Sequence, residues 1–256
     1  MKALLRIFRQ RFSRARALCA LFLSSAAACL FISLYFFITE NPKGAMIALL
    51  FLLIILLLPP TEHLLGIRLS LPCYALLLFL CLGALLGSTF NFYFRIPVWD
   101  LFLHALSGWL FAYIGFEICL RLFPKSERRA VFPYLFVGVL FSLSAALLWE
   151  LFEAGATWLL PVDMQEDTLV HAIRSFFLSG THDAPTEIRG ITETVIRYEG
   201  GRTLTLAGYL DLGLTDTLTD MAICLCGNLL FLASYPLLRR AGGRPSLRHG
   251  AQADKK

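Results

Sequence analysis

The most informative segment of the chain is Asp211-Leu-Gly-Leu-Thr-Asp216-Thr-Leu-Thr-Asp220-Met, which continues without a break into Ala-Ile-Cys-Leu-Cys-Gly227-Asn228-Leu-Leu-Phe-Leu. Its second half has the apolar composition of a membrane-spanning helix. Its first half carries Asp216 and Asp220 four residues apart, which places both carboxylates on one helix face. An ionised carboxylate costs about 3 kcal/mol at the centre of a membrane helix. We therefore expect this face to meet a partner, a cation, protons or a water-filled cavity.

The composition of the whole chain is typical of a membrane protein. Of its 256 residues, 57% are hydrophobic and only 16% are charged, whereas soluble domains carry about 25% charged residues. Apolar runs near the length needed to cross a bilayer are a second indication. These runs lie at about residues 17–38, 44–58, 71–90, 99–123, 131–159 and 212–238. The sequence therefore predicts an all-α polytopic membrane protein with six transmembrane helices, the second of which is expected to end at Pro59-Pro60.

The distribution of Lys and Arg predicts the orientation of these helices, because cytoplasmic flanks carry most basic residues. With the N-terminus inside, 17 of the 23 Lys and Arg residues fall on the inner side and six on the outer side, so both termini are expected to be cytoplasmic. The expected parts are a basic cytoplasmic N-terminus (1–16), transmembrane helices one to five (17–160), an extracytoplasmic loop (161–211), transmembrane helix six (212–238) and a basic, disordered cytoplasmic tail (239–256). The net charge of +5 follows from these flanks, so the lipid bilayer and not nucleic acid is the expected partner.

The long loop between the last two predicted helices is expected to be ordered. Residues 192–198 and 202–206 alternate in period two around Glu199-Gly200-Gly201, which is typical of a β-hairpin. Residues 167–178 are interpreted as a short amphipathic helix on the membrane surface. The loop is therefore interpreted as a lid over the outer ends of the helices.

The predicted topology brings polar residues of three helices to one depth. Each helix carries a pair at a spacing of three or four residues near its outer end, at about 5–15 Å below the membrane boundary. The six residues are Asp100, His104, Glu150, Glu153, Asp216 and Asp220. No Lys or Arg occurs in the outer halves of these helices. We therefore expect the six side chains to form one site.

A bound cation is the simplest way to accommodate five acids in a membrane, because ionised, dry carboxylates are unfavourable there. Carboxylates with one imidazole suit Mg²⁺, Mn²⁺, Ca²⁺ or Zn²⁺, so all six residues are candidate metal ligands. His104, Glu150 and Glu153 are the candidate catalytic residues, as general bases. Asp100 equally fits an acid that complements the dipole at a helix N-terminus, whereas Glu150 and Glu153 approach a C-terminal end, where the dipole disfavours them. Glycines 108, 115 and 227 are interpreted as positions of close helix packing.

Several motifs resemble a known family. The motifs are Trp99-Asp-x-x-x-His104-x-x-Ser-Gly108, Glu150-x-x-Glu153 and Asp216-Thr-x-x-Asp220-Met-x6-Asn228. Over about residues 90–231 the chain resembles the YjdF-like bacterial inner-membrane proteins, in a subgroup described only as membrane-spanning proteins. It resembles VanZ-like proteins more distantly, with Gly-Asn in place of their Asn-x-x-Gly. The resemblance implies a multi-pass protein of the bacterial cytoplasmic (inner) membrane and the positions of its motifs, and it implies no substrate.

Three functions fit these residues. The first is a metal-dependent, membrane-embedded enzyme that acts on a lipid or envelope precursor. The second is a cation- or proton-coupled transporter whose acids bind the ion in transit, although no polar path continues past Asn228 and no inverted repeat is evident. The third is a non-catalytic envelope protein with a structural metal site and a loop that binds a partner. The sequence ranks the enzyme slightly above the transporter.

Overall fold

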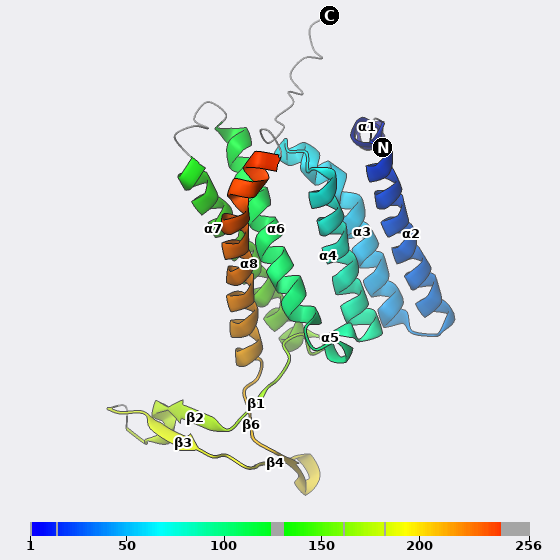
Figure 1. The fold of residues 1–256 in the computed structure, drawn as a ribbon. Coiled ribbons are helices and arrows are strands. Elements are labelled where there is room, and N and C mark those ends of the chain that lie inside the picture. The colour runs from blue at the N-terminus through cyan, green and yellow to red at the C-terminus, as the bar shows by residue number, and fades with distance from the viewer. Residues whose placement is uncertain (1, 14, 124–130, 161, 182, 242–256) are drawn as a thin grey trace, which may run out of the picture. The chain divides into compact units, whose positions relative to one another are not determined.

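The computed structural model describes residues 2–13, 15–123, 131–160, 162–181 and 183–241 (Figure 1). The chain divides into two compact units, which are described separately. Unit 1 consists of residues 1–146 and 222–256, and unit 2 consists of residues 147–221.

Six helices in the described part of the chain are long and apolar enough to cross a membrane. They are α2 (Arg16–Ile38), α3 (Pro42–Leu65), α4 (Leu71–Phe90), α6 (Trp99–Leu122), α7 (Val131–Leu159) and α8 (Leu214–Ala241). Two shorter helices, α1 (Lys2–Phe12) and α5 (Phe92–Arg95), precede α2 and α6. The six-helix prediction is therefore confirmed. Apolar runs predict such helices because the thickness of the bilayer sets the length of a spanning helix.

The predicted end of the second spanning helix at Pro59-Pro60 is wrong. Helix α3 continues through both prolines to Leu65 and ends at Gly66, which has a φ of 65°. A proline inside a helix removes one backbone hydrogen bond, and its ring crowds the carbonyl four residues earlier. The extra turn is held from outside the helix, since Glu62 in this turn contacts Arg11 of α1. Tertiary contact therefore outweighs the local helix-breaking signal.

The helices of unit 1 enclose two apolar cores. The first core lies among α1, α2, α3, α4 and α6, where Ile55, Tyr74 and Leu85 are fully buried. The second core joins α6, α7 and α8 through Phe116, Tyr134 and Phe231.

Glycines allow α6, α7 and α8 to approach each other at backbone distance. Gly108 of α6 lies against the backbone carbonyl of Cys224 in α8, and Gly227 of α8 lies against the carbonyl of Ala105 in α6. A Cβ at Gly115 of α6 would lie 2.7 Å from the Phe141 Cβ in α7. The close-packing interpretation of these three glycines is confirmed, and it follows the rule that small residues line membrane helix interfaces.

Unit 2 contains three two-stranded antiparallel sheets. In these sheets β1 (Leu169–Val170) pairs with β6 (Tyr209–Leu210), β2 (Ala172–Ser175) with β3 (Thr186–Arg189), and β4 (Thr194–Tyr198) with β5 (Arg202–Leu206). The β4–β5 hairpin confirms the prediction from period and turn. Its turn contains Gly200 and Gly201 at φ values of 72° and 71°, which glycine adopts without steric penalty.

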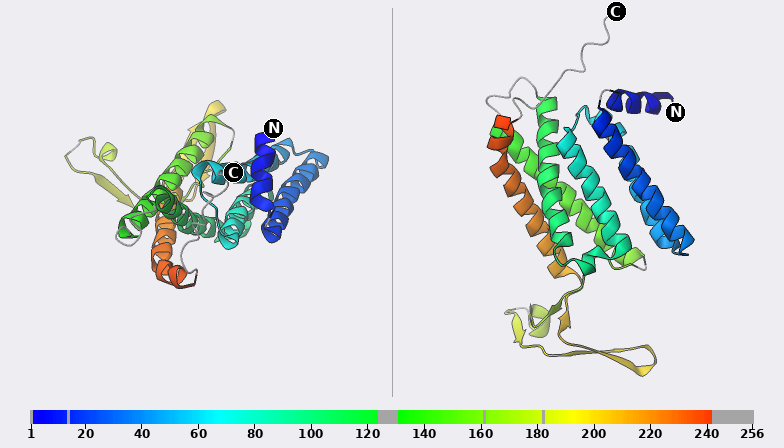
Figure 2. Two further views of the ribbon diagram at one scale, coloured as in Figure 1. Left: turned by 90° about the horizontal axis from the view of Figure 1, so that it is seen from above. Right: turned by 45° about the vertical axis from the view of Figure 1, so that its right-hand side comes forward.

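The predicted amphipathic helix over residues 167–178 is wrong. This segment forms β1, β2 and the single 3₁₀ turn η2 (Phe176–Leu178) (Figure 2). The backbone of β2 is satisfied by β3, and Arg174 pairs with Glu187 on the facing strand at 3.1 Å. Periodicity over so short a segment does not separate helix from strand, so the strand partner decides.

Candidate functional site

The first polar pair of the predicted site lies in unit 1, at the start of α6. Asp100 is in the first turn of this helix and His104 is in the next, with His104 Nε2 at 3.5 Å from Asp100 Oδ1. The start of α6 is fixed against α4 because the Trp99 indole N–H donates to the Gly83 carbonyl at 3.1 Å. The His104 side chain is 11% exposed and the Asp100 side chain 31%. The spacing of four residues therefore brings the two groups together, as the sequence predicts.

A group of three carboxylates lies within unit 2. Glu150 and Glu153 of α7 and Asp220 of α8 each offer one carboxylate oxygen, and these oxygens all lie within 4.8 Å of one another. All three residues are buried. The spans Val131–Leu159 and Leu214–Leu238 contain no Lys or Arg. Three carboxylates at such distances would repel each other if all three were ionised.

Asp216, the remaining predicted ligand, contacts the loop. Its Oδ2 accepts the backbone N–H of Glu166 at 3.1 Å. At the next residue of α8, the Thr217 hydroxyl accepts a hydrogen bond from the Gln165 amide at 2.8 Å. The beginning of the loop is therefore attached to the first turn of α8 by two polar contacts.

Asp211 organises the junction between the loop and α8. It accepts the backbone N–H groups of Thr168, Gly213 and Thr215 at 3.0, 3.3 and 3.0 Å, and it also accepts the Thr215 hydroxyl. Partial burial opposes ionisation of this carboxyl, but the hydrogen bonds from Thr215, Thr168 and Gly213 outweigh burial and lower its pKa. Asp211 thus acts as a cap for the start of α8 and as the anchor of the β1–β6 pair.

The pKa of nearby Asp167 is shifted in the opposite direction. Desolvation raises the pKa of this carboxyl, and the negative charges of Asp163 and Asp211 raise it further. At the loop junction, the ionised form of Asp211 is therefore favoured, whereas the ionised form of Asp167 is disfavoured.

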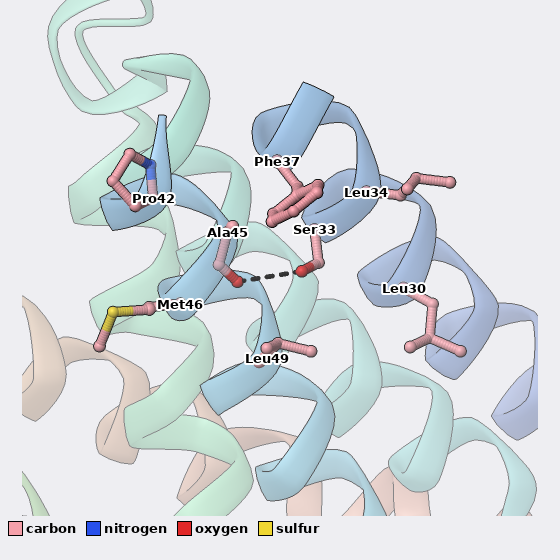
Figure 3. A pocket seen from close by; sticks show the side chains of 8 residues that line it. All are labelled: Leu30, Ser33, Leu34, Phe37, Pro42, Ala45, Met46 and Leu49. Atoms are coloured by element: carbon pink, nitrogen blue, oxygen red, sulfur yellow. Dashed lines mark hydrogen bonds between the residues drawn. The ribbon is translucent and has the colours of Figure 1, made fainter. Parts of the chain in front are cut away.

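A hollow lies on the surface between α2 and α3 in unit 1. This cavity of about 380 Å³ is lined by Leu30, Ser33, Leu34, Phe37, Pro42, Ala45, Met46 and Leu49 (Figure 3). Its one side-chain hydroxyl, on Ser33, donates to the Ala45 carbonyl at 3.2 Å. The hollow contains no titratable group, so it offers no chemistry of its own.

Two further carboxylates are not singled out by the sequence patterns: Glu117, which is half-buried, and Glu62, which is buried. Glu117 in α6 is hydrogen-bonded to the Tyr113 hydroxyl, and the spacing of four residues on an apolar helix was the available signal. Glu62 in α3 forms an ion pair with Arg11 at 2.5 Å. It was missed because the helix was expected to end at the preceding prolines.

Six membrane-length helices with a buried carboxylate group define a multi-pass α-helical membrane protein. The chain belongs to the family described as "Predicted membrane protein (DUF2238)", whose sequence model matches residues 19–241. This family membership confirms the expected class of membrane protein. No curated protein and no solved structure gives a significant match to the chain.

Proposed function

We propose that this protein binds a divalent cation within the membrane, with Glu150, Glu153 and Asp220 as ligands. The observation that carries the proposal is the approach of three buried carboxylate oxygens to within 4.8 Å of one another. A divalent cation converts their mutual repulsion into attraction. Carboxylate oxygens are the ligands preferred by Mg²⁺, Ca²⁺ and Mn²⁺.

Asp100, His104 and Asp216 are proposed as additional ligands on the strength of their spacing and the predicted helix topology. An imidazole ligand would add Zn²⁺ to the metals that the site accepts. The contribution of these residues is separable from that of the carboxylate group in unit 2, because each can be substituted without altering Glu150, Glu153 or Asp220.

The proposed use of the cation is catalysis on a lipid or envelope precursor. A divalent cation supplies Lewis acidity toward a phosphoryl or acyl oxygen. His104, Glu150 or Glu153 would then accept the proton of the attacking water as a general base. A non-catalytic, structural role of the same cation is the simplest rival.

Transport is the second candidate function, and α8 supplies the observation that favours it. Asp216, Asp220, Cys224 and Asn228 repeat every four residues along one face of this helix. Asn228 is fully buried, and its amide lies 4.0 Å from the Cys224 sulfur. A polar stripe of this kind is typical of ion and proton paths in membrane proteins.

The bacterial inner membrane is the proposed location, with residues 1–16 and 239–256 in the cytoplasm and residues 161–211 outside it. The excess of Lys and Arg on one side supports this orientation. The YjdF-like and more distant VanZ-like relationships are proposed on the motifs around Asp100, Glu150 and Asp216. Fusions of alkaline phosphatase after residue 66 and after residue 200 test the orientation, and only the second is expected to be active.

The experiment that tests the proposal is measurement of metal content by mass spectrometry on protein purified without chelators. Wild type is expected to retain about one divalent ion per chain, and Asp220→Asn and Glu150→Gln are expected to lose it. Glu193→Gln, an exposed loop acid, is the matched control and retains the ion. His104→Ala and Asp216→Asn define the remaining ligands.

Each outcome assigns the function. If folded wild type contains no metal, the proposal is contradicted. The next measurement is then proton flux in liposomes. Metal retained by wild type, together with turnover of a phosphorylated lipid that Asp220→Asn lacks, supports the enzyme. Metal without turnover of phosphorylated lipids, and without ion flux, supports the structural role.

A further inference from the structure

The N-terminal helix α1 has two faces of different chemistry. Lys2, Arg6 and Arg9 follow each other at spacings of four and three residues, so they share one face, and all three are exposed. The other face carries Phe8 and Phe12, which contact the ring of Phe22 in α2 at centroid distances of 5.7 and 4.9 Å. The helix is therefore amphipathic, with its cations directed away from the bundle.

Arg11 does not belong to the exposed basic face. It lies nine residues after Lys2, which turns it to the opposite side of α1, and its side chain is only 12% exposed. Its guanidinium contacts both carboxylate oxygens of Glu62, at 2.5 and 3.1 Å, and donates to the Leu69 carbonyl at 2.9 Å.

Glu62, the acceptor in this ion pair, has a further hydrogen-bond partner, and Arg11 has a further aromatic contact. Glu62 also accepts the Leu69 backbone N–H at 2.7 Å, and the Arg11 guanidinium lies 5.2 Å from the centre of the Tyr74 ring. A bidentate pair of this kind fixes orientation as well as distance. Arg11 and Glu62 thus hold α1 in a single rotation about its own axis.

Helix α1 lies at the end of the membrane-length helix α2. Helix α2 begins at Arg16, four residues after α1 ends, and α1 lies across the end of α2 instead of continuing it (Figure 2). A helix across the end of a spanning helix lies along the interface. The attraction of a cation to anionic lipid acts within about one Debye length of the surface, roughly 8 Å.

Exposed leucines on α1 are a second feature that suits contact with a lipid surface. Leu4 and Leu5 are 48% and 63% exposed, and interfacial helices bury such side chains at the boundary of headgroups and acyl chains. The cleft beside the ion pair, lined in part by Gln10, His63 and Arg68, has a volume of only about 30 Å³. That volume accommodates about one water molecule, so the cleft is too small for a lipid headgroup.

We infer that α1 is a docked interfacial helix whose Lys2, Arg6 and Arg9 bind the phosphate groups of anionic phospholipids, while the Arg11–Glu62 pair sets the rotation that presents them. This inference concerns unit 1 and is independent of the proposed cation site. A cationic face alone fits any anionic partner. The adjoining spanning helix and the exposed leucines select the bilayer.

The test is binding of phosphatidylglycerol and phosphatidylcholine to the full-length, detergent-solubilised protein, measured by native mass spectrometry. Wild type is expected to retain phosphatidylglycerol preferentially, and the preference is expected to fall on the order of tenfold in K2Q/R6Q/R9Q. The matched control is K43Q/R197Q/R202Q, which removes three exposed cations elsewhere and is expected to keep the preference. Added salt is expected to weaken binding to wild type.

The role of the Arg11–Glu62 pair in orienting α1 is tested with a separate variant. R11Q/E62Q removes both buried charges together and leaves all three exposed cations, so loss of lipid preference in this folded double variant supports a set rotation of α1. Full preference in R11Q/E62Q overturns the role of the ion pair. Equal loss in K2Q/R6Q/R9Q and K43Q/R197Q/R202Q, or binding of an anionic protein or nucleic acid in place of lipid, overturns the lipid site.

Discussion

Gly108 of α6 lies so close to the backbone carbonyl of Cys224 in α8 that no side chain fits between the two helices. Backbone atoms cannot rotate away as a flexible side chain can. We therefore expect Gly108→Ala to separate the helices and to lower the free energy of unfolding by about 1–3 kcal/mol. Thermal unfolding of the purified protein, followed by tryptophan fluorescence, measures this change.

Gly155→Ala is the matched control for this prediction, because a Cβ at Gly155 meets no atom within 4 Å. Alanine has the higher helix propensity, by about 1 kcal/mol, so this variant is expected to be at least as stable as wild type. Similar destabilisation by both variants would show that the approach of Gly108 to Cys224 is not the cause.

The Arg11–Glu62 pair predicts a non-additive pattern of stability. Either Arg11→Gln or Glu62→Gln leaves one largely buried charge without its partner, which we expect to lower the free energy of unfolding by about 3 kcal/mol. The double variant removes both charges, and we expect it to lose less than the sum of the two single variants. A double-mutant cycle from thermal or denaturant unfolding measures the difference, and strict additivity would contradict a direct interaction.

The carboxylate group of unit 2 predicts a strong effect of neutral substitutions on metal affinity. Asp220→Asn preserves the shape of the side chain and removes one ligand charge, so we expect the dissociation constant for Mn²⁺ to rise at least about tenfold. Titration of the metal-free protein, followed by electron paramagnetic resonance of free Mn²⁺, measures this constant. An unchanged constant in Asp220→Asn, with Glu193→Gln as the reference variant, would exclude Asp220 as a ligand.

The loop junction predicts opposite pH effects of two neighbouring acids. The hydrogen bonds of Asp211 lower its pKa below the unfolded value of about 3.8, so its contribution to stability is present above that pH and is lost as the pH falls through the folded pKa. The pKa of Asp167 is raised, so ionised Asp167 opposes folding at neutral pH. Protonation of Asp167 in mild acid removes this opposition.

Two variants measure these effects. At pH 7 we expect Asp211→Asn to accelerate hydrogen exchange at Thr168 and Thr215, and Asp167→Asn to slow exchange in the same segment. The difference in hydrogen-exchange rate between Asp167→Asn and wild type is expected to decrease as the pH is lowered, because wild-type Asp167 then becomes neutral as well. Equal protection in both variants at pH 7 would show that the two carboxyls do not control the junction.

Several parts of this protein follow from local chemistry and can be predicted from the amino-acid pattern alone. The apolar runs specified six spanning helices, since bilayer thickness dictates their length. The alternation around Gly200-Gly201 specified the β4–β5 hairpin, because glycine alone adopts that turn without strain. Spacings of three and four residues likewise specified the pairs Asp100–His104 and Glu150–Glu153, since helical geometry places such residues on one face.

The contacts between groups from distant segments are evident from the folded structure and not from the sequence pattern. Glu150, Glu153 and Asp220 converge, whereas Asp216 contacts the backbone of Glu166, and the spacing within α8 does not distinguish its two acids. Arg11 holds the end of α3 beyond two prolines, and β3 pairs with a segment whose own pattern suggested a helix. In the last two cases a partner far away in the sequence satisfies a charge or a backbone hydrogen bond, and this outweighs the preference of the local segment.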